Sequence, residues 1–238
     1  MKNCIAPANR NTRRILPIAC ATALAAAFTV SLSHPAHADE VNPPPVPSNI
    51  QVPAGNKAFL EGHAVGTQNY ICVPCPNPTT SMCPDVSGFA WILFTPQATL
   101  FKDNNKQVIT HFFSPNPFEN NTNPGVVAAG MIRATWQDSR DTSTVWAKTN
   151  QSSSDPAFVE PGAIAWLLLE VVGAQDGPTG SHTLTATTFI QRLNTSGGLA
   201  PSDGCSQFSD VGAEAFVPYT ADYFFYKKAS KSDADDSN

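Results

Sequence analysis

Side chains that could carry chemistry are few in this sequence, and they are widely spaced. Beyond the N-terminal segment there are three histidines, His63, His111 and His182, each within a different stretch of strand character. Histidines on separate strands can converge on a metal ion, because imidazole is a common metal ligand. No H-x-H spacing accompanies them, so we favour three separate histidines and expect neither a metal nor another cofactor.

A second group of such residues lies near the C-terminal end, before a Gly-rich turn. It consists of Gln191, Arg192 and Asn194. The arginine could present its planar guanidinium to a carboxylate or a phosphate, with the amides orienting that ligand. Alternatively, the arginine pairs with Asp222 or Glu170 and has a structural role. We favour this structural interpretation, in which Asn194 closes the turn.

The aromatic residues also admit two interpretations. Tryptophans and Tyr70 on strand-like segments can form a hydrophobic core, which is the default, or a platform on which a flat ligand stacks. The candidate ligand-binding set that combines these groups is Tyr70, His111, Trp136, Gln191, Arg192 and Asp222.

Four cysteines follow the N-terminal segment, and an even number indicates two disulfides in an oxidising compartment. Three pairings of Cys72, Cys75, Cys83 and Cys205 are possible. Prolines mark the stretch around Cys75 and Cys83 as a loop, so we expect these two to form a bridge across it. That bridge leaves Cys72 for Cys205. The alternative is a zinc site that begins with the C-x2-C spacing of Cys72 and Cys75.

The first 38 residues have the three parts of a cleavable export signal. Basic residues come first, an apolar run follows from Ile15 to Leu32, and Ala36-His37-Ala38 forms an A-x-A site. We expect cleavage after Ala38, a secreted or periplasmic protein, and no association with a membrane after cleavage. The alternative is an uncleaved anchor, because the apolar run is at the lower limit of a spanning length.

The charge of the remaining chain excludes one class of partner. The signal segment holds 4 of the 14 basic residues and none of the 19 acidic ones, so the rest of the chain has a formal charge of −9. An acidic protein without a basic patch has little attraction for phosphate backbones, and we therefore exclude nucleic acid as a partner.

The composition predicts four parts: a signal peptide (1–38), a Pro-rich arm (39–56), a β-domain (57–228) and a disordered tail (229–238). The prolines of the arm favour an extended polyproline conformation over packed structure. The β-domain contains eight segments rich in β-branched and aromatic residues, separated by Gly, Pro, Asn, Asp or Ser clusters. These segments are 58–73, 88–101, 107–114, 130–137, 143–149, 164–172, 182–194 and 215–228. They predict an all-β, single-domain fold, either an antiparallel β-sandwich or a closed barrel of about eight strands.

Alternation along the last segment predicts which side chains share a face. One face carries Tyr219, Ala221, Tyr223 and Phe225, and the other carries Thr220, Asp222, Phe224 and Tyr226.

Several stretches of the β-domain resemble a known family. The stretches from Ile190 to Pro201 and from Val217 to Tyr226, with Gly204-Cys205 between them, are similar to domain-of-unknown-function family 3455. Earlier stretches agree, including Gly66 to Cys72 and Ala165 to Leu169. The resemblance covers nearly the whole β-domain and implies a secreted protein of unassigned activity, of a kind found in bacteria and fungi. Some fungal members carry a malate dehydrogenase label.

The dehydrogenase label disagrees with the residues of this chain. Nicotinamide binding in that class uses G-x-G-x-x-G between a strand and a helix. That spacing does not occur here, and Gly197-Gly198 leads into Ala200-Pro201 instead of a helical stretch. We therefore expect no binding of NAD or NADH.

Two classes of function remain. The one we favour is a non-catalytic β-domain that binds a small organic or glycan ligand through aromatic and amide side chains, in a barrel mouth or a sheet groove. The second is an extracellular hydrolase or redox enzyme with a site near His111, Arg192 and Asp222. The sequence lacks G-x-S-x-G and H-E-x-x-H, which are local signatures of common hydrolases, so binding takes first place.

Overall fold

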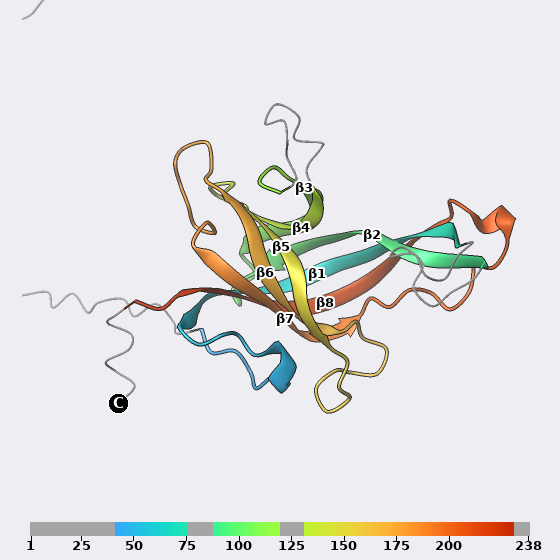
Figure 1. Ribbon diagram of the computed structural model, residues 1–238, viewed down its shortest axis with the longest axis horizontal. Helices are drawn as coiled ribbons and strands as arrows, with labels where there is room; N and C mark the ends of the chain where they lie inside the picture. Colours follow the sequence, from blue (N-terminus) through green and yellow to red (C-terminus); the bar gives the residue numbers. More distant parts are fainter. Residues whose placement is uncertain (1–40, 76–87, 120–130, 231–238) are drawn as a thin grey trace, which may run out of the picture. The chain divides into compact units, whose positions relative to one another are not determined.

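The computed structural model describes residues 41–75, 88–119 and 131–230, and all structural statements below refer to these residues. Eight β-strands form the body of the protein (Figure 1). Their bounds are β1 Asn56–Cys75, β2 Gly88–Phe101, β3 Gln107–Asn116, β4 Met131–Asp138, β5 Thr144–Ser153, β6 Trp166–Gln175, β7 Thr187–Gly197 and β8 Glu214–Lys228. Two short 3-10 turns, η1 Ser48–Ile50 and η3 Phe208–Asp210, complete the regular structure of the described residues.

The eight strands form a closed antiparallel barrel. Each strand pairs with the next one along the chain, and β8 returns to pair with β1. The open choice between a sandwich and a barrel is thereby decided in favour of the barrel. Several predicted strand boundaries are off by a few residues, and the largest difference is at the seventh strand, which begins at Thr187, so that His182 lies before it. The backbone bonds from Thr185 to His182 and from Thr187 to the Leu184 carbonyl close the turn that precedes this strand.

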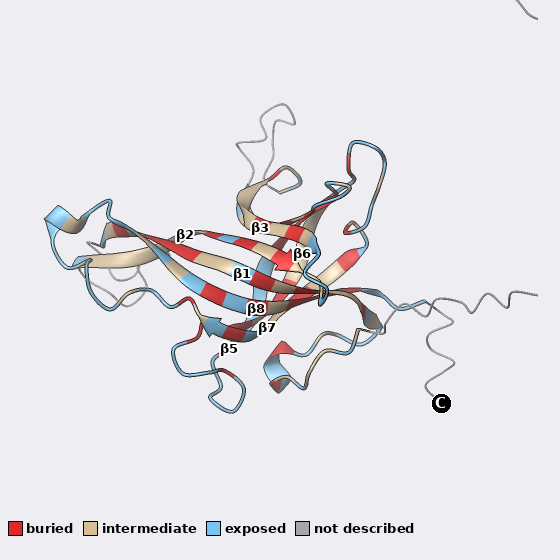
Figure 2. Cartoon of the chain, turned by 180° about the vertical axis from the view of Figure 1, so that it is seen from behind, coloured by how far each residue is buried: buried red, intermediate tan, exposed pale blue. Residues whose placement is uncertain are grey.

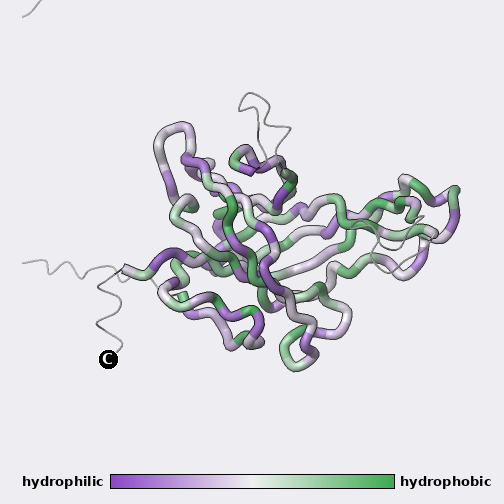
Figure 3. The backbone as a smooth tube through the Cα atoms, in the orientation of Figure 1, coloured by the Kyte–Doolittle hydropathy of each residue, from purple (hydrophilic) through white to green (hydrophobic). Residues whose placement is uncertain are grey.

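Side chains alternate between the lumen and the outside of the barrel, because strand residues point to opposite faces with a period of two. On β8, Tyr219, Ala221, Tyr223 and Phe225 are buried in the interior cluster, as the alternation predicted. Buried and exposed positions follow one another along β1 and β8 in Figure 2. The tube in Figure 3 likewise changes repeatedly between hydrophobic and hydrophilic residues along the strands.

A second apolar cluster lies on the outer side of β6, β7 and β8, under the Pro-rich arm. Ile50 in the arm is completely buried there, against residues that include Trp166, Leu193 and Phe224. Three valines of the arm pack against the same cluster. The expectation that the arm would avoid packing is therefore wrong. The prolines keep its backbone extended, but the apolar residues between them cover an outer face that would otherwise be exposed.

A disulfide joins Cys72 at the end of β1 to Cys205 in the connection between β7 and β8. The two Cα atoms are 5.5 Å apart, and the cysteines are separated by 133 positions. Backbone bonds between Cys72 and residues 212 and 213 fasten the same connection. The predicted Cys72–Cys205 pairing is confirmed, which removes a zinc site that includes Cys72. The predicted bridge from Cys75 to Cys83 lies outside the described residues because Cys83 does.

The predicted signal peptide also lies outside the described residues, as does most of the predicted tail. Among the described residues no helix is long and apolar enough to cross a membrane.

We expect Cys205→Ala to lower the free energy of unfolding by about 2 to 5 kcal/mol, because the bridge closes a long loop in the unfolded chain. Chemical denaturation of the oxidised protein would measure this change. Ser206→Ala serves as the matched control, because Ser206 is next to the cysteine and takes no part in the bridge. Equal stability of Cys205→Ala and wild type would contradict a stabilising role for the bridge.

Candidate ligand-binding cavity

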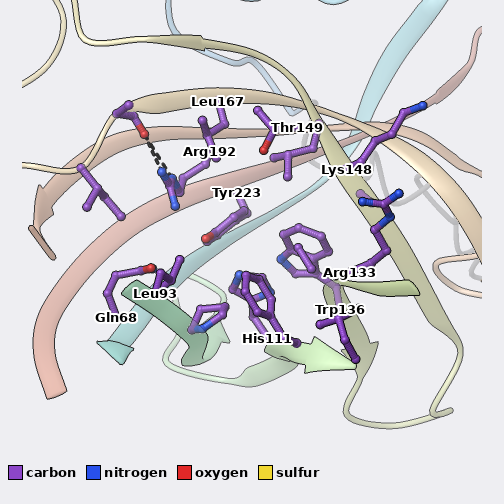
Figure 4. A pocket seen from close by; sticks show the side chains of 18 of the residues that line it. Gln68, Leu93, His111, Arg133, Trp136, Lys148, Thr149, Leu167, Arg192 and Tyr223 are labelled. Carbon is purple, nitrogen blue, oxygen red and sulfur yellow. Dashed lines mark hydrogen bonds between the residues drawn. The ribbon is translucent and has the colours of Figure 1, made fainter. Parts of the chain in front are cut away.

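The barrel contains a cavity of about 770 Å³ among its interior side chains. Its lining comes from most of the strands and includes Gln68 on β1, His111 on β3, Trp136 on β4, Arg192 on β7 and Tyr223 on β8 (Figure 4). Aliphatic residues such as leucines, isoleucines and alanines cover much of the remaining wall. The closed sheet thus holds a mainly apolar space with a few polar groups inside it.

Three rings form one wall of this cavity. His111 and Trp136 are direct cross-strand neighbours and stack with ring centroids 4.2 Å apart and an angle of 10° between their planes. The Tyr223 ring lies against both, at 5.3 Å from His111 and 5.7 Å from Trp136. All three side chains are almost completely buried, so their neighbours hold the rings in place and only a small part of the ring surface is accessible from the cavity.

His111 is a neutral imidazole in this environment. Complete burial lowers its pKa to about 3, and the backbone contact with Thr135 only partly opposes this effect. Its Nδ1 lies 2.9 Å from the Thr135 carbonyl, and a carbonyl can only accept, so Nδ1 carries the proton. Nε2 is then the acceptor nitrogen of the ring.

Arg192 is one of three cations among the described residues that line the cavity. Its Nε and one terminal nitrogen donate to the Ala165 carbonyl at 3.2 and 2.8 Å. The predicted pairing with Asp222 or Glu170 is wrong: Glu170 lies 3.6 Å from Lys148, and Asp222 pairs with His63. Alternation explains the difference for Asp222, because it follows Ala221 and precedes Tyr223, which both point inward.

The charge of Arg192 acts on the phenols around the cavity. Burial raises the pKa of Tyr70 and of Tyr223, and the positive charge of Arg192 opposes the rise in both. Tyr70 itself is held at the cavity wall, since its hydroxyl donates to the Gly198 carbonyl at 2.6 Å. Gly198 has a φ of +85°, and a Cβ there would lie 2.9 Å from the Tyr219 side chain, so this close approach requires glycine.

Two donors among the lining residues have no partner. The indole nitrogen of Trp136 and Nε2 of Gln68 are buried and make no hydrogen bond. Burial raises the pKa of Tyr219, and the nearby Gln68 amide opposes this rise. The Nε2 atom of Gln68 nevertheless makes no hydrogen bond of ordinary geometry. A buried unpaired donor costs about 1 to 3 kcal/mol. Each unpaired buried group in a native structure calls for an explanation, and a bound molecule in the cavity is one such explanation.

The structure brings together four of the six residues in the predicted set. Tyr70, His111, Trp136 and Arg192 all line the cavity. Gln191 and Asp222 lie on the other side of the barrel wall, each next to a residue that faces inward. The Gln191 amide donates to the Ile50 carbonyl at 2.7 Å and accepts from the Tyr226 hydroxyl, so it anchors the arm.

Sequence reasoning missed Gln68 and Tyr223 as cavity residues. Gln68 is two positions before Tyr70 on β1, and Tyr223 shares a face with Tyr219 and Phe225. Strict alternation from a chosen residue would have found both.

The three histidines occupy three different environments and do not form one site. His111 is in the lumen, His182 is in a turn, and His63 is on the outer surface of β1. The His63 ring contacts Asp222 at 2.7 Å and Asp103 at 2.9 Å through its two nitrogens. Glu61, His63 and Asp222 are close enough to ligate one cation, but the His63 nitrogens are already used by these carboxylates.

An antiparallel eight-stranded closed barrel defines a class of small β-proteins whose interior is either filled by side chains or holds one small ligand. Within that class, the chain belongs to the family described as Protein of unknown function (DUF3455), whose model matches residues 53–227. The resemblance seen in the sequence is thereby confirmed. Comparison with curated proteins and with solved structures gives no match.

We expect His63 to titrate above its ordinary pKa of 6.5, chiefly because Asp222 accepts a hydrogen bond from its charged form. The stabilisation from this contact is complete below the unfolded pKa and is lost as the pH rises through the folded pKa. An NMR titration of the ring should show the raised pKa, and Asp222→Asn should lower it. An unchanged midpoint in Asp222→Asn would contradict the assignment.

His111 should behave in the opposite way. Since its folded pKa is about 3, we expect its ring signals not to titrate between about pH 8 and pH 5. Below about pH 6.5 His111 is protonated in the unfolded chain but stays neutral in the folded protein. His111 therefore lowers the free energy of unfolding as the pH falls. A ring titration with a midpoint near 6.5 would show that His111 is accessible to water and would contradict its burial.

Proposed function

We propose that this protein binds a small, mainly apolar organic molecule inside its β-barrel. The observation that carries the proposal is the cavity of about 770 Å³ with the stacked His111 and Trp136 rings in its wall. This volume lies within the range of about 300 to 1,000 Å³ that is typical of sites for small ligands. The lining supports an organic molecule over a glycan, because a sugar has hydroxyls on every side and needs more polar partners than this wall provides.

The geometry supports binding over the alternative of catalysis. The proposed enzyme site needs His111, Arg192 and Asp222 together, and Asp222 is on the outer surface with His63. The remaining histidine is oriented by a backbone carbonyl, and its low pKa makes it a weak base. The closed antiparallel sheet also differs from the parallel α/β sheet that holds nicotinamide cofactors.

The compartment belongs to the same proposal. Disulfides such as Cys72–Cys205 form and persist in oxidising environments, where thiols are not kept reduced. This supports the export that the N-terminal signal predicts. The protein would then collect its ligand outside the cytoplasm.

The neutral dye N-phenylnaphthylamine, whose fluorescence rises in apolar surroundings, tests binding directly. We expect saturable binding at one site per chain, with quenching of Trp136 fluorescence. Ala147→Leu adds volume to a side chain that lines the cavity and should weaken binding at least about tenfold.

Thr220→Leu is the matched control, because Thr220 is exposed on the outer face of β8. It adds apolar surface outside the barrel and should leave affinity unchanged. Equal binding by both variants and wild type would place the dye on the surface and would contradict the proposal.

A further inference from the structure

We infer that the ligand of this cavity is an organic carboxylate whose anionic end binds the Arg192 guanidinium, while its apolar body lies against the aromatic wall. This inference rests on the proposed function and specifies the chemistry of its ligand.

The guanidinium of Arg192 has donors left over. Arginine carries five N–H groups in a planar fork. The Ala165 carbonyl accepts from this guanidinium at 3.2 and 2.8 Å (Figure 4), and the Tyr223 hydroxyl lies close enough for the guanidinium to oppose the rise in the Tyr223 pKa. Arg192 sits opposite Leu167 on one side and Tyr223 on the other, so its neighbours across the sheet are an aliphatic chain and a phenol.

The two other cations among the described residues that line the cavity each have a carboxylate counter-ion, which Arg192 lacks. Arg133 contacts Glu119, with Nε 2.7 Å from a carboxylate oxygen, and Lys148 contacts Glu170 at 3.6 Å. Both of these residues also line the cavity, and both have a counter-ion. Among the described residues that line it, none is Asp or Glu.

Arg192 is half-buried, so its guanidinium has lost part of its solvent without gaining a carboxylate partner among the described residues. Removing an ion from water costs several kcal/mol unless an opposite charge and good hydrogen bonds replace the solvent. A carbonyl dipole supplies part of this compensation for Arg192 but no opposite charge. A bound anion would supply the rest, and it would gain from the low dielectric of the lumen.

The other polar groups of the cavity favour the same chemistry. The unpartnered atoms are donors, at Gln68 and Trp136, so the ligand should bring acceptors. A carboxylate has two oxygens in a plane and matches the guanidinium fork. Of the three cations among the described lining residues, Arg192 alone has no carboxylate partner, so a singly charged head group fits better than a dianionic phosphate, which would leave its second charge unpaired.

A matched pair of probes separates this inference from the proposed function. Naphthalene carboxylate and its neutral carboxamide have nearly the same shape, and isothermal titration calorimetry measures the affinity of each for the wild-type protein. We expect the carboxylate to bind at least about tenfold more tightly. Equal affinities would overturn the inference and leave the proposed function in place. If neither probe bound, both proposals would fail.

Variants then assign the preference to a residue. Arg192→Met should weaken carboxylate binding to the level of the carboxamide, while carboxamide binding stays within about threefold of wild type. Arg140→Met removes an exposed cation that does not line the cavity, and it should preserve the preference. Retention of the preference in Arg192→Met would overturn the assignment.

Folding of the variants is checked independently. Near-UV circular dichroism shows whether Arg192→Met keeps the aromatic wall. If it does not, Arg192→Lys keeps a charge without the planar fork and should lower the preference without removing it. The wild-type comparison of the two probes needs no variant and decides the ligand class by itself.

Discussion

Pairing of β8 with β1 is the constraint on which the rest of the structure depends. It joins the two ends of the β-domain along most of both strands, from Asn56 opposite Lys228 to Ile71 opposite Glu214. Without this ladder the meander would have two open edges, and its inner face would be accessible to water. With it, the inner face of the sheet lines a cavity that is open to solvent on one side, and Arg192 lies half-buried in it.

Closure also gives the two faces of each strand different chemistry. Neighbours on one strand have separate roles: Arg192 faces the cavity and Gln191 holds the arm, while Tyr223 faces the cavity and Asp222 holds His63. The same division gives the two histidines of β1 and β3 opposite pKa shifts. His63 gains carboxylate partners on the outside, and His111 loses solvent on the inside.

Local patterns were sufficient to predict the strands, whereas the site required knowledge of the register. The hairpin turn at Asp103 to Lys106 follows from its Asn and Asp residues, and Asn105 has the positive φ of 59° that such turns use. The stacking of His111 on Trp136 depends on the alignment of β3 with β4, which no local pattern specifies. The difference between a filled core and a cavity depends on the sum of side-chain volumes around the ring of strands. The prolines of the arm indicate an extended segment, but they do not show that Ile50 between them packs against the outer face of the barrel.

The charge distribution of the chain has opposite effects on an anionic ligand outside the barrel and at Arg192. Residues 39–238 have a formal charge of −9, so the exterior repels anions at long range and slows their encounter. That repulsion is screened beyond about 8 to 10 Å at physiological salt. Screening is weaker at the half-buried Arg192 guanidinium, which has no carboxylate partner among the described residues. The exterior therefore affects mainly the rate of association, while affinity is decided within the barrel by Arg192 and the rings around it.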